Sequence, residues 1–270
     1  MNSDATKGAA VAESVRYEVV DGIAVITLNR PENGNALDTT MGQALTRAVE
    51  SAAGDPSVRA LMLTAKGKAF CVGGDIMEMR GAGNLPQLME EAIPRLHAMI
   101  RSLTTLPIPV ISVLNGPIGG GGIALALCAD IVIAAESMKL RGGYSAIGLT
   151  PDLGASYFLA ARAGAARAKE IFFLNEPVGA LQCLEWGILN AVFPDAELHD
   201  EAWKLARRLA SAASLSLGRI KHLVDGAAAR PLDDHLALEQ GYMIASARSE
   251  DGKEGIAAFM EKRSPRFTGQ

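Results

Sequence analysis

The sequence lacks the features that tie a chain to a membrane, a nucleic acid or a metal. No apolar stretch reaches about 18 residues, which excludes a membrane-spanning helix. The net charge is −4 and no basic run is present, so neither a nucleic acid nor an anionic membrane is indicated as a partner. The three cysteines, Cys71, Cys128 and Cys183, are scattered and have no metal-ligand spacing. This cysteine usage is typical of a reducing compartment, so we expect a cytoplasmic protein without a metal.

The first residues also lack the marks of a targeting segment. They are small and polar, with neither the apolar core of a signal peptide nor the Arg-rich bias of a transit peptide. We interpret residues 1–14 as a disordered terminus. The chain has 270 residues, 49% of them hydrophobic. It can therefore bury a large core and is compatible with one domain plus a short appendage.

What the sequence does contain is an alternation of strand and helix patterns. Asp21-Gly22 lies between two β-rich runs, 15–20 and 23–29, and predicts a hairpin. Further strands are predicted over 59–65, 109–115, 131–136 and 189–194, with helices from residue 37, in the stretch before Pro107, and over 123–129, 157–174 and 180–187. Residues 139–156 are rich in loop-forming residues, and most of the chain from Leu198 to Lys262 is helical in pattern. The alternation predicts an α/β fold with an added helical layer.

Four consecutive glycines, Gly119–Gly122, stand between the apolar strand 109–115 and the short helix 123–129. Glycine lets the backbone bend freely and lets a ligand approach the main chain closely. The first turn of a helix carries N–H groups without internal partners, and its dipole favours negative charge. The glycines therefore predict a site for an anion or an oxyanion.

A weak internal repeat places a second turn of this kind in the chain. Strand 59–65 leads to Gly73-Gly74-Asp75 and a helix, as strand 109–115 leads to the four glycines. Both turns follow the carboxyl end of a strand, where open α/β folds bind ligands. Two such turns side by side could aim two N–H groups at one oxygen.

Other interpretations of the four glycines remain open from the residues alone. Gly119 to Ala124 fits the dinucleotide pattern G-x-G-x-x-A, and Glu136 ends the next strand. Against this interpretation, the intervening helix is short for a crossover, and the unit lies in the middle of the chain. A P-loop is excluded, because no Lys-Ser/Thr pair follows the glycines. Close packing of strand and helix without any ligand is the third possibility.

Several longer stretches together resemble the crotonase family of enoyl-CoA hydratases and isomerases, over residues 15–267. They are ITLNRPENGNAL (26–37), GKAFCVGGDIMEM (67–79), LPIPVISVLNGPIGGGGIALALCADIVIA (106–134), IGLTPDLGASYFLA (147–160) and WGILNAVFP (186–194). The stretch 242–267 is similar to the ring-epoxide phenylacetyl-CoA isomerase branch of that family, beside the 3-enoyl to 2-enoyl-CoA isomerases. The resemblance implies a spiral of ββα units over 15–197 and a helical trimerisation region over 198–270. It also implies a homotrimer or hexamer, and a coenzyme A thioester as substrate without a further cofactor.

The resemblance assigns roles to individual residues of this chain. The main-chain N–H groups of Gly74 and Gly121 are implied to hold the thioester oxygen when the substrate becomes an enolate, a charge that fixed dipoles in a dry site stabilise. The coenzyme A is implied to run along Arg30, Ala36, Lys68, Phe70, Asp75, Ile76 and Met77. Phe259 and Lys262 are implied to reach the nucleotide of a neighbouring protomer. Lys68 and Lys262 fit equally well as solvated surface lysines.

The chain departs from the family pattern at both glutamates of the hydratases. The matching positions hold Ala124 and Tyr144, so the paired carboxylates that add water are absent. One acid remains, Asp152 in GLTPDLG, where several isomerases of the family carry a single Asp or Glu. Shifting a double bond from the 3- to the 2-position needs one base, which removes a proton at C2 and returns it at C4. The competing interpretation of Asp152 is a helix N-cap.

His97 supplies an alternative to isomerisation. It lies beside the apolar stripe of its predicted helix, where a histidine is usually structural. Aryl-CoA dehalogenases of the family, however, pair a His at this place with an Asp at the position of Asp152. Those enzymes carry a tryptophan where this chain has Tyr144, which weakens the match. We therefore expect an enoyl-CoA isomerase using Gly74, Gly121 and Asp152. The alternatives are a hydratase without the glutamate pair, a dehalogenase-like enzyme using Asp152 and His97, and a non-catalytic acyl-CoA-binding protein.

Overall fold

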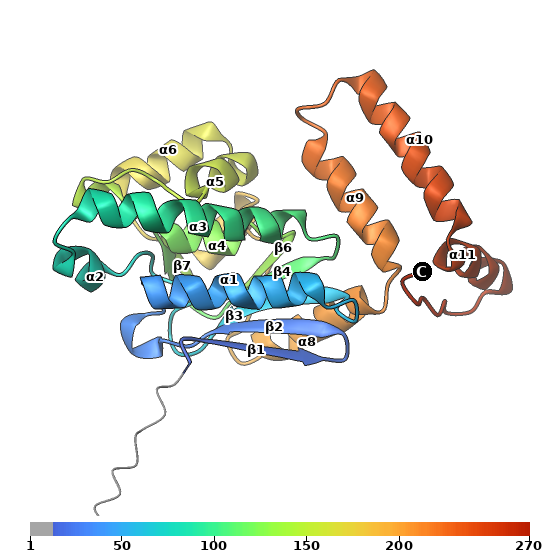
Figure 1. Ribbon diagram of the computed structural model, residues 1–270, viewed down its shortest axis with the longest axis horizontal. Helices are drawn as coiled ribbons and strands as arrows, with labels where there is room; N and C mark the ends of the chain where they lie inside the picture. The colour runs from blue at the N-terminus through green and yellow to red at the C-terminus, as the bar shows by residue number, and fades with distance from the viewer. Residues whose placement is uncertain (1–12) are drawn as a thin grey trace, which may run out of the picture.

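A computed structural model describes residues 13–270 and contains one large sheet of six strands in the order β1-β2-β3-β4-β6-β9 (Figure 1). These strands are β1 (Val15–Val20), β2 (Ile23–Leu28), β3 (Ala60–Ala65), β4 (Val110–Leu114), β6 (Ile131–Ala135) and β9 (Ala191–Phe193). All neighbours pair in parallel except β1 and β2, which form the predicted hairpin. Asp21 and Gly22 both have positive φ there, 53° and 75°, as a tight hairpin turn requires. The expectation of a disordered terminus falls mainly on residues outside those described.

The sheet is buried on both faces, because helices cover each of them. All six residues of β2 are buried, and they alternate between two cores, with Ile26 on one face and Val25 on the other. The first face is covered by α1 (Thr39–Gly54), α3 (Leu85–Thr105) and α4 (Gly121–Leu127). The second face is covered by α8 (Leu198–Ala210), which buries Leu198, Ala202, Ala206 and Ala210.

A second, three-stranded sheet lies beyond the carboxyl ends of the large one. Its order is β5-β7-β8, from β5 (Ile118–Gly119), β7 (Lys139–Arg141) and β8 (Val178–Gly179). The stretch 139–156, rich in loop-forming residues, also contains β7 and the short 3₁₀ turn Ser145–Ile147, which the sequence did not predict. The predicted helix 157–174 is two helices, α5 (Ala155–Ala163) and α6 (Ala165–Leu174), because Gly164 has φ 80° between them. After β8 comes α7 (Ala180–Glu185), near its predicted place.

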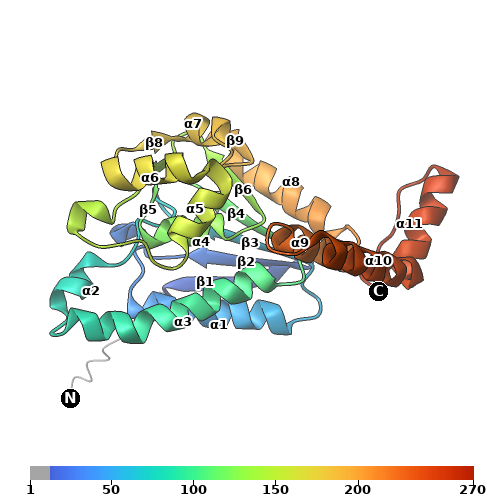
Figure 2. The ribbon, with the colours of Figure 1, turned by 90° about the horizontal axis from the view of Figure 1, so that it is seen from above.

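The last three helices extend away from the sheet, as Figures 1 and 2 show from two directions. They are α9 (Ser214–Gly226), α10 (Leu232–Arg248) and α11 (Glu250–Glu261). The predicted boundary at residue 198 coincides with the start of α8, but α8 still packs on the sheet, and the extension begins with α9. Lys221 of α9 joins it to the core by an ion pair with Asp130, with Nζ 3.0 Å from Oδ2. Within residues 13–270, no helix is long and apolar enough to cross a bilayer.

Candidate active site

The two glycine turns lie against each other at the carboxyl ends of β3 and β4. A Cβ built on Gly73 would lie 3.0 Å from the carbonyl oxygen of Gly119 and 3.4 Å from the nitrogen of Gly121. No side chain fits between the two backbones at this distance. Gly73 and Gly120 also have positive φ, 109° and 49°, which glycine adopts without strain. The sequence repeat thus corresponds to two turns in main-chain contact.

Each turn presents one N–H group that has no partner among the described residues. Around Gly74, the carbonyl of Gly73 accepts from Leu37 N at 2.7 Å and Asp75 N donates to the Leu37 carbonyl at 2.9 Å, but Gly74 N donates to none of them. Gly121 N is equally free in the described part of the chain. Helix α4 begins at Gly121, two residues earlier than predicted, because Gly120 makes the bend that starts it. Both groups therefore remain available to a ligand.

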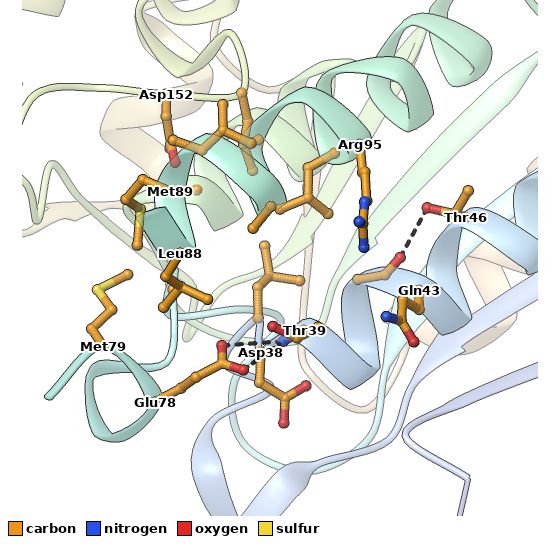
Figure 3. A pocket seen from close by; sticks show the side chains of 18 of the residues that line it. Asp38, Thr39, Gln43, Thr46, Glu78, Met79, Leu88, Met89, Arg95 and Asp152 are labelled. Atoms are coloured by element: carbon orange, nitrogen blue, oxygen red, sulfur yellow. Dashed lines mark hydrogen bonds between the residues drawn. The ribbon is translucent and has the colours of Figure 1, made fainter. Parts of the chain in front are cut away.

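Two cavities meet at these N–H groups. The smaller, about 370 Å³, lies between α1, α3 and the short helix α2 (Ile76–Gly81), and Figure 3 shows it from close by. The larger, about 970 Å³, is bordered by the loop 143–154 and the start of α2. The residues that line both cavities are Gly74, Met79, Met89, Ile93, Gly121, Asp152 and Leu153. A group bound at the junction would therefore contact both glycines and Asp152.

Asp152 is half-buried at this junction and is held by one neighbour. The hydroxyl of Tyr144 donates to Asp152 Oδ1 at 2.5 Å. The same oxygen lies 3.7 Å from the Cβ position of Gly121. Burial, and then the charge of Asp152, raise the pKa of Tyr144 far above its ordinary value, so this hydroxyl stays protonated and donates.

The N-cap interpretation of Asp152 was wrong. The residue at the cap of α5 is Gly154, whose φ of 91° starts the helix, and no side chain caps it. Only the main-chain carbonyl of Asp152 contributes, by accepting from Ala155 N at 2.8 Å. Between them, Leu153 is 3% exposed and has φ 53°, a conformation that costs a non-glycine residue free energy. The carboxylate of Asp152 is thus left free to face the cavities.

The structure brings His97 into the same larger cavity as Asp152, from helix α3. The imidazole of His97 makes no hydrogen bond to any residue in 13–270. Ala124, where hydratases carry a glutamate, is fully buried in α4 and lines neither cavity. Among the described residues, Asp152 is the only carboxylate that lines both cavities.

Four of the residues assigned to coenzyme A line the larger cavity, namely Ala36, Asp75, Ile76 and Met77. Arg30 stands behind them, and donates to the Ala36 carbonyl at 2.7 Å and to Asp75 Oδ2 at 3.0 Å. Asp75 also caps α2 by accepting from Met77 N. Burial raises the pKa of Asp75, but the hydrogen bonds from Glu78 N, Arg30 and Met77 N outweigh it and hold the pKa below its ordinary value.

The other residues assigned to coenzyme A lie elsewhere. Lys68 is exposed outside both cavities. Phe70 is fully buried in the main core, so its side chain cannot touch a ligand. Phe259 is 82% exposed on α11, and Lys262 follows that helix, both away from the cavities of their own chain. The sequence interpretation missed the cavity wall formed by Met79 and Met89, because apolar residues at helical spacing look the same in a core as in a pocket.

The remaining titratable groups provide no second reactive centre in the described part of the chain. Burial raises the pKa of Cys71, Cys128 and Cys183 to about 12, so all three thiols stay protonated and unreactive. Within residues 13–270 no three His, Cys, Asp or Glu side chains gather as metal ligands would. The groups at the cavity junction that a ligand can contact are therefore Asp152, the two main-chain donors and their immediate neighbours.

The largely parallel sheet, the helices on both of its faces and the helical extension make up the crotonase fold. A family model described as enoyl-CoA hydratase/isomerase matches residues 18–270, and the chain belongs to that family of enzymes. It is 38% identical to 1,2-epoxyphenylacetyl-CoA isomerase of Escherichia coli (strain K12), over 96% of this chain and 99% of the relative. It is 36% identical to "Probable enoyl-CoA hydratase" of Rhodobacter capsulatus, over 95% and 98% of the two chains. The crystal structure of an enoyl-CoA hydratase from Polaromonas sp. JS666 matches with a TM-score of 0.88 and 32% identity, over 94% of this chain and 99% of that one.

Proposed function

We propose that this protein is an enoyl-CoA isomerase that moves a double bond from the 3- to the 2-position. The observation that carries the proposal is that one carboxylate, Asp152, shares a cavity junction with two free main-chain N–H groups. An isomerisation needs one base and a site for the enolate oxygen, and no further acid.

The reaction follows from this arrangement. The thioester oxygen binds at the junction and accepts from Gly74 N and Gly121 N. Asp152 takes a proton from C2, and the electrons of that C–H bond pass into a dienolate whose negative oxygen the two donors stabilise. Each such donor contributes about 3–4 kcal/mol to the transition state. The protonated Asp152 then gives its proton to C4, which leaves the double bond between C2 and C3.

Tyr144 positions the base in this scheme. Its hydroxyl binds Oδ1 of Asp152 at 2.5 Å, which fixes the carboxylate plane and leaves Oδ2 for the substrate proton. Tyr144 and Asp152 both lie on the loop 143–154, which borders the larger cavity. A protonated tyrosine also limits how many water molecules can surround the carboxylate.

A dehalogenase-like reaction is the second candidate, because His97 and Asp152 line the same cavity. In that reaction Asp152 attacks the halogen-bearing aryl carbon and the halide ion leaves, and His97 then activates the water that hydrolyses the resulting aryl ester of Asp152. A hydratase reaction would rest on Asp152 alone, because Ala124 and Tyr144 stand at the glutamate positions. Assays with a halogenated aryl-CoA and with a 2-enoyl-CoA test these two candidates directly.

We also infer that the enzyme works as a trimer or hexamer in the cytoplasm. Large apolar side chains are exposed along the extension, among them Val224, Leu236 and Met243. Their exposure in a single chain supports burial against other subunits. In such an assembly Phe259 and Lys262 would meet a nucleotide bound by a neighbour, next to the portion held by Ala36 and the start of α2.

The decisive experiment replaces Asp152 by Asn and follows the turnover of a 3-enoyl-CoA. We expect turnover to fall by about 10²–10⁴-fold, because the base is lost, while calorimetry shows that the thioester still binds. Asp200→Asn is the matched control, since Asp200 is exposed on α8 and lines neither cavity.

Exchange of the C2 hydrogen in D₂O separates the remaining possibilities. Exchange in the wild type that disappears in Asp152→Asn supports the proton shuttle. Unchanged turnover in the variant would overturn the assignment of the base. Binding without any exchange would identify a non-catalytic binding protein, and rapid formation of a 3-hydroxyacyl-CoA from a 2-enoyl-CoA would identify a hydratase.

A further inference from the structure

The smaller cavity changes its chemistry between its two ends. Near Asp152 its walls are apolar and include Met79, Leu88 and Met89. At the opposite side, between α1 and α3, its walls are polar and include Gln43 and Arg95. Figure 3 shows this division, with Arg95 directed toward the helix that carries Gln43 and Thr46. A thioester held at the junction would send its acyl chain along the apolar part toward this polar end.

The carboxylates of this cavity besides Asp152 already have partners. Asp38 pairs with Arg30, Oδ2 to Nη1 at 3.0 Å, and its Oδ1 caps α1 by accepting from Met41 N at 2.7 Å. Both oxygens of Glu78 accept from Thr39 N at 3.1 Å. Neither acid is therefore directed at the cations of the polar end.

The cations of the polar end have no such partners. The guanidinium of Arg95 forms no hydrogen bond and no ion pair with any residue that the structure describes, and the same holds for the guanidinium of Arg47. The amide of Gln43 is likewise free within 13–270. The hydroxyl of Thr46 donates to the Gly42 carbonyl at 2.9 Å, which leaves its oxygen able to accept. The polar end thus offers donors and positive charge that the described chain does not use.

Helix packing holds these groups opposite one another. A Cβ on Gly42 would lie 3.0 Å from Leu96 Cδ2, so α1 and α3 approach closely at this point. On α1, Gln43 directly follows Gly42, and Thr46 lies about one turn beyond Gln43. On α3, Arg95 directly precedes Leu96. The polar groups therefore stand on two rigid helices, beside a close contact that keeps their separation constant.

We propose that the acyl group of the substrate ends in a carboxylate, so that the substrate is a coenzyme A monothioester of a dicarboxylic acid. The guanidinium of Arg95 receives the distal carboxylate, and Gln43 adds an amide donor. Arginine binds carboxylates through two parallel N–H groups, which neutral polar ends of an acyl chain cannot match. This inference rests on the proposed function, since it requires the thioester at the junction and the chain in the smaller cavity.

The exposure of Arg95 at the outer end of the cavity limits how strongly the protein can prefer a carboxylate-ended acyl chain. Ion pairs in contact with water are worth up to about 1 kcal/mol, which corresponds to a preference of about fivefold. The preference weakens as salt concentration rises, because ions screen an exposed pair. A purely apolar acyl end gains nothing from these groups.

Calorimetry with two saturated acyl-CoA thioesters of equal chain length, one ending in methyl and one in carboxylate, tests this inference. At low salt, and at the chain length that spans the cavity, we expect the carboxylate-ended thioester to bind the wild type about fivefold more tightly. The ratio of the two dissociation constants should fall toward one in Arg95→Gln and keep part of its value in Arg95→Lys. Arg101→Gln, which removes the same charge from the same helix outside the cavity, should keep the wild-type ratio.

Either of two results would overturn the inference. One is equal binding of the two thioesters by the wild type across a series of chain lengths. The other is a preference that survives in Arg95→Gln. The measurement uses saturated thioesters, so it does not depend on turnover, and a failure of the proposed isomerisation would appear separately in the 3-enoyl-CoA assay.

Discussion

The neighbouring glycines Gly121 and Gly122 have different surroundings, which predict a role in activity for the first and in packing for the second. A Cβ on Gly121 would lie 3.1 Å from a methyl of Leu153, a flexible side chain that can move slightly. A Cβ on Gly122 would overlap the carbonyl of Cys71, which is fixed main chain. The first position faces the cavities, whereas the second faces the strand behind the turn.

We expect Gly121→Ala to fold and to lose activity, and Gly122→Ala to lose stability. The methyl group at residue 121 crowds the place of the thioester oxygen and Asp152, and a displacement of about 1 Å costs about 100-fold in turnover. Overpacking at residue 122 costs about 1–3 kcal/mol or more of unfolding free energy. Urea unfolding and steady-state kinetics measure the two effects. Equal stability losses in both variants would contradict the division of roles.

The two glycine turns at 73–75 and 119–122 could be predicted from the sequence, but the contacts of Asp152 could not. Glycine turns are local, so the repeat of strand, glycines and helix is visible in the residues. The hydrogen bond from Tyr144 to Asp152 is not, because it joins two residues eight positions apart across a loop, and no sequence pattern marks the left-handed Leu153 that follows Asp152. For the same reason the sequence left a helix N-cap at Asp152 as a competing interpretation, whereas the cap residue of α5 is Gly154.

At the scale of elements, helix α2 depends on one carboxylate. Asp75 caps its first turn and pairs with Arg30, so we expect Asp75→Asn to cost about 1–2 kcal/mol at neutral pH. The pKa of Asp75 is lowered in the folded state, from an unfolded value near 3.8. The contribution of the charge is therefore fully present above pH 3.8 and is lost as the pH falls through the folded-state pKa.

Unfolding of both proteins in urea at a series of pH values measures this dependence. The difference between wild type and Asp75→Asn should stay constant above the unfolded pKa and shrink below it. Asp233→Asn at an exposed position of α10 provides a comparison for an aspartate with no ion pair among the described residues. A difference that grows toward acid pH would show that another group causes it.

Elements with strong local patterns were predicted from the sequence, and elements defined by distant partners were not. The strands of the large sheet and helices α1 and α3 follow from apolar periodicity. Strand β7 has only three residues and pairs with β5 and β8, about 20 and 40 residues away, so its own sequence says little about it. Gly164 separates α5 from α6 inside a continuous helical pattern, which periodicity cannot distinguish from one helix.

For the whole molecule, the extension from α9 to α11 is the part that we propose to contact other subunits. It is fixed to the core by Lys221 and by Arg59, which donates to the carbonyls of Ala212 and Phe267 at 2.6 and 3.1 Å. Its orientation is therefore set by the subunit itself, while its apolar side chains stay uncovered.

We expect a solution mass of about three or six times 28.3 kDa by light scattering after size exclusion. Replacing Leu236 and Met243 together by Lys places two charges on exposed apolar positions of α10 and should shift the mass to one subunit. Gln240→Lys adds a charge at an exposed polar position of the same helix and should leave the mass unchanged. A wild type of 28.3 kDa would contradict the assembly.

In the proposed function the two oxyanion donors are main-chain groups, and this has a consequence for how such a protein can change over evolutionary time. No point mutation except one to proline removes the N–H of residue 74 or 121, although an added side chain crowds the site around it. The identity of the proposed reaction depends instead on the side chains at residues 97, 124, 144 and 152, each of which a single substitution replaces. In such a fold the main-chain donors stay the same while the acid and base side chains around them are replaced. New reactions can therefore arise without rebuilding the site that binds the enolate oxygen.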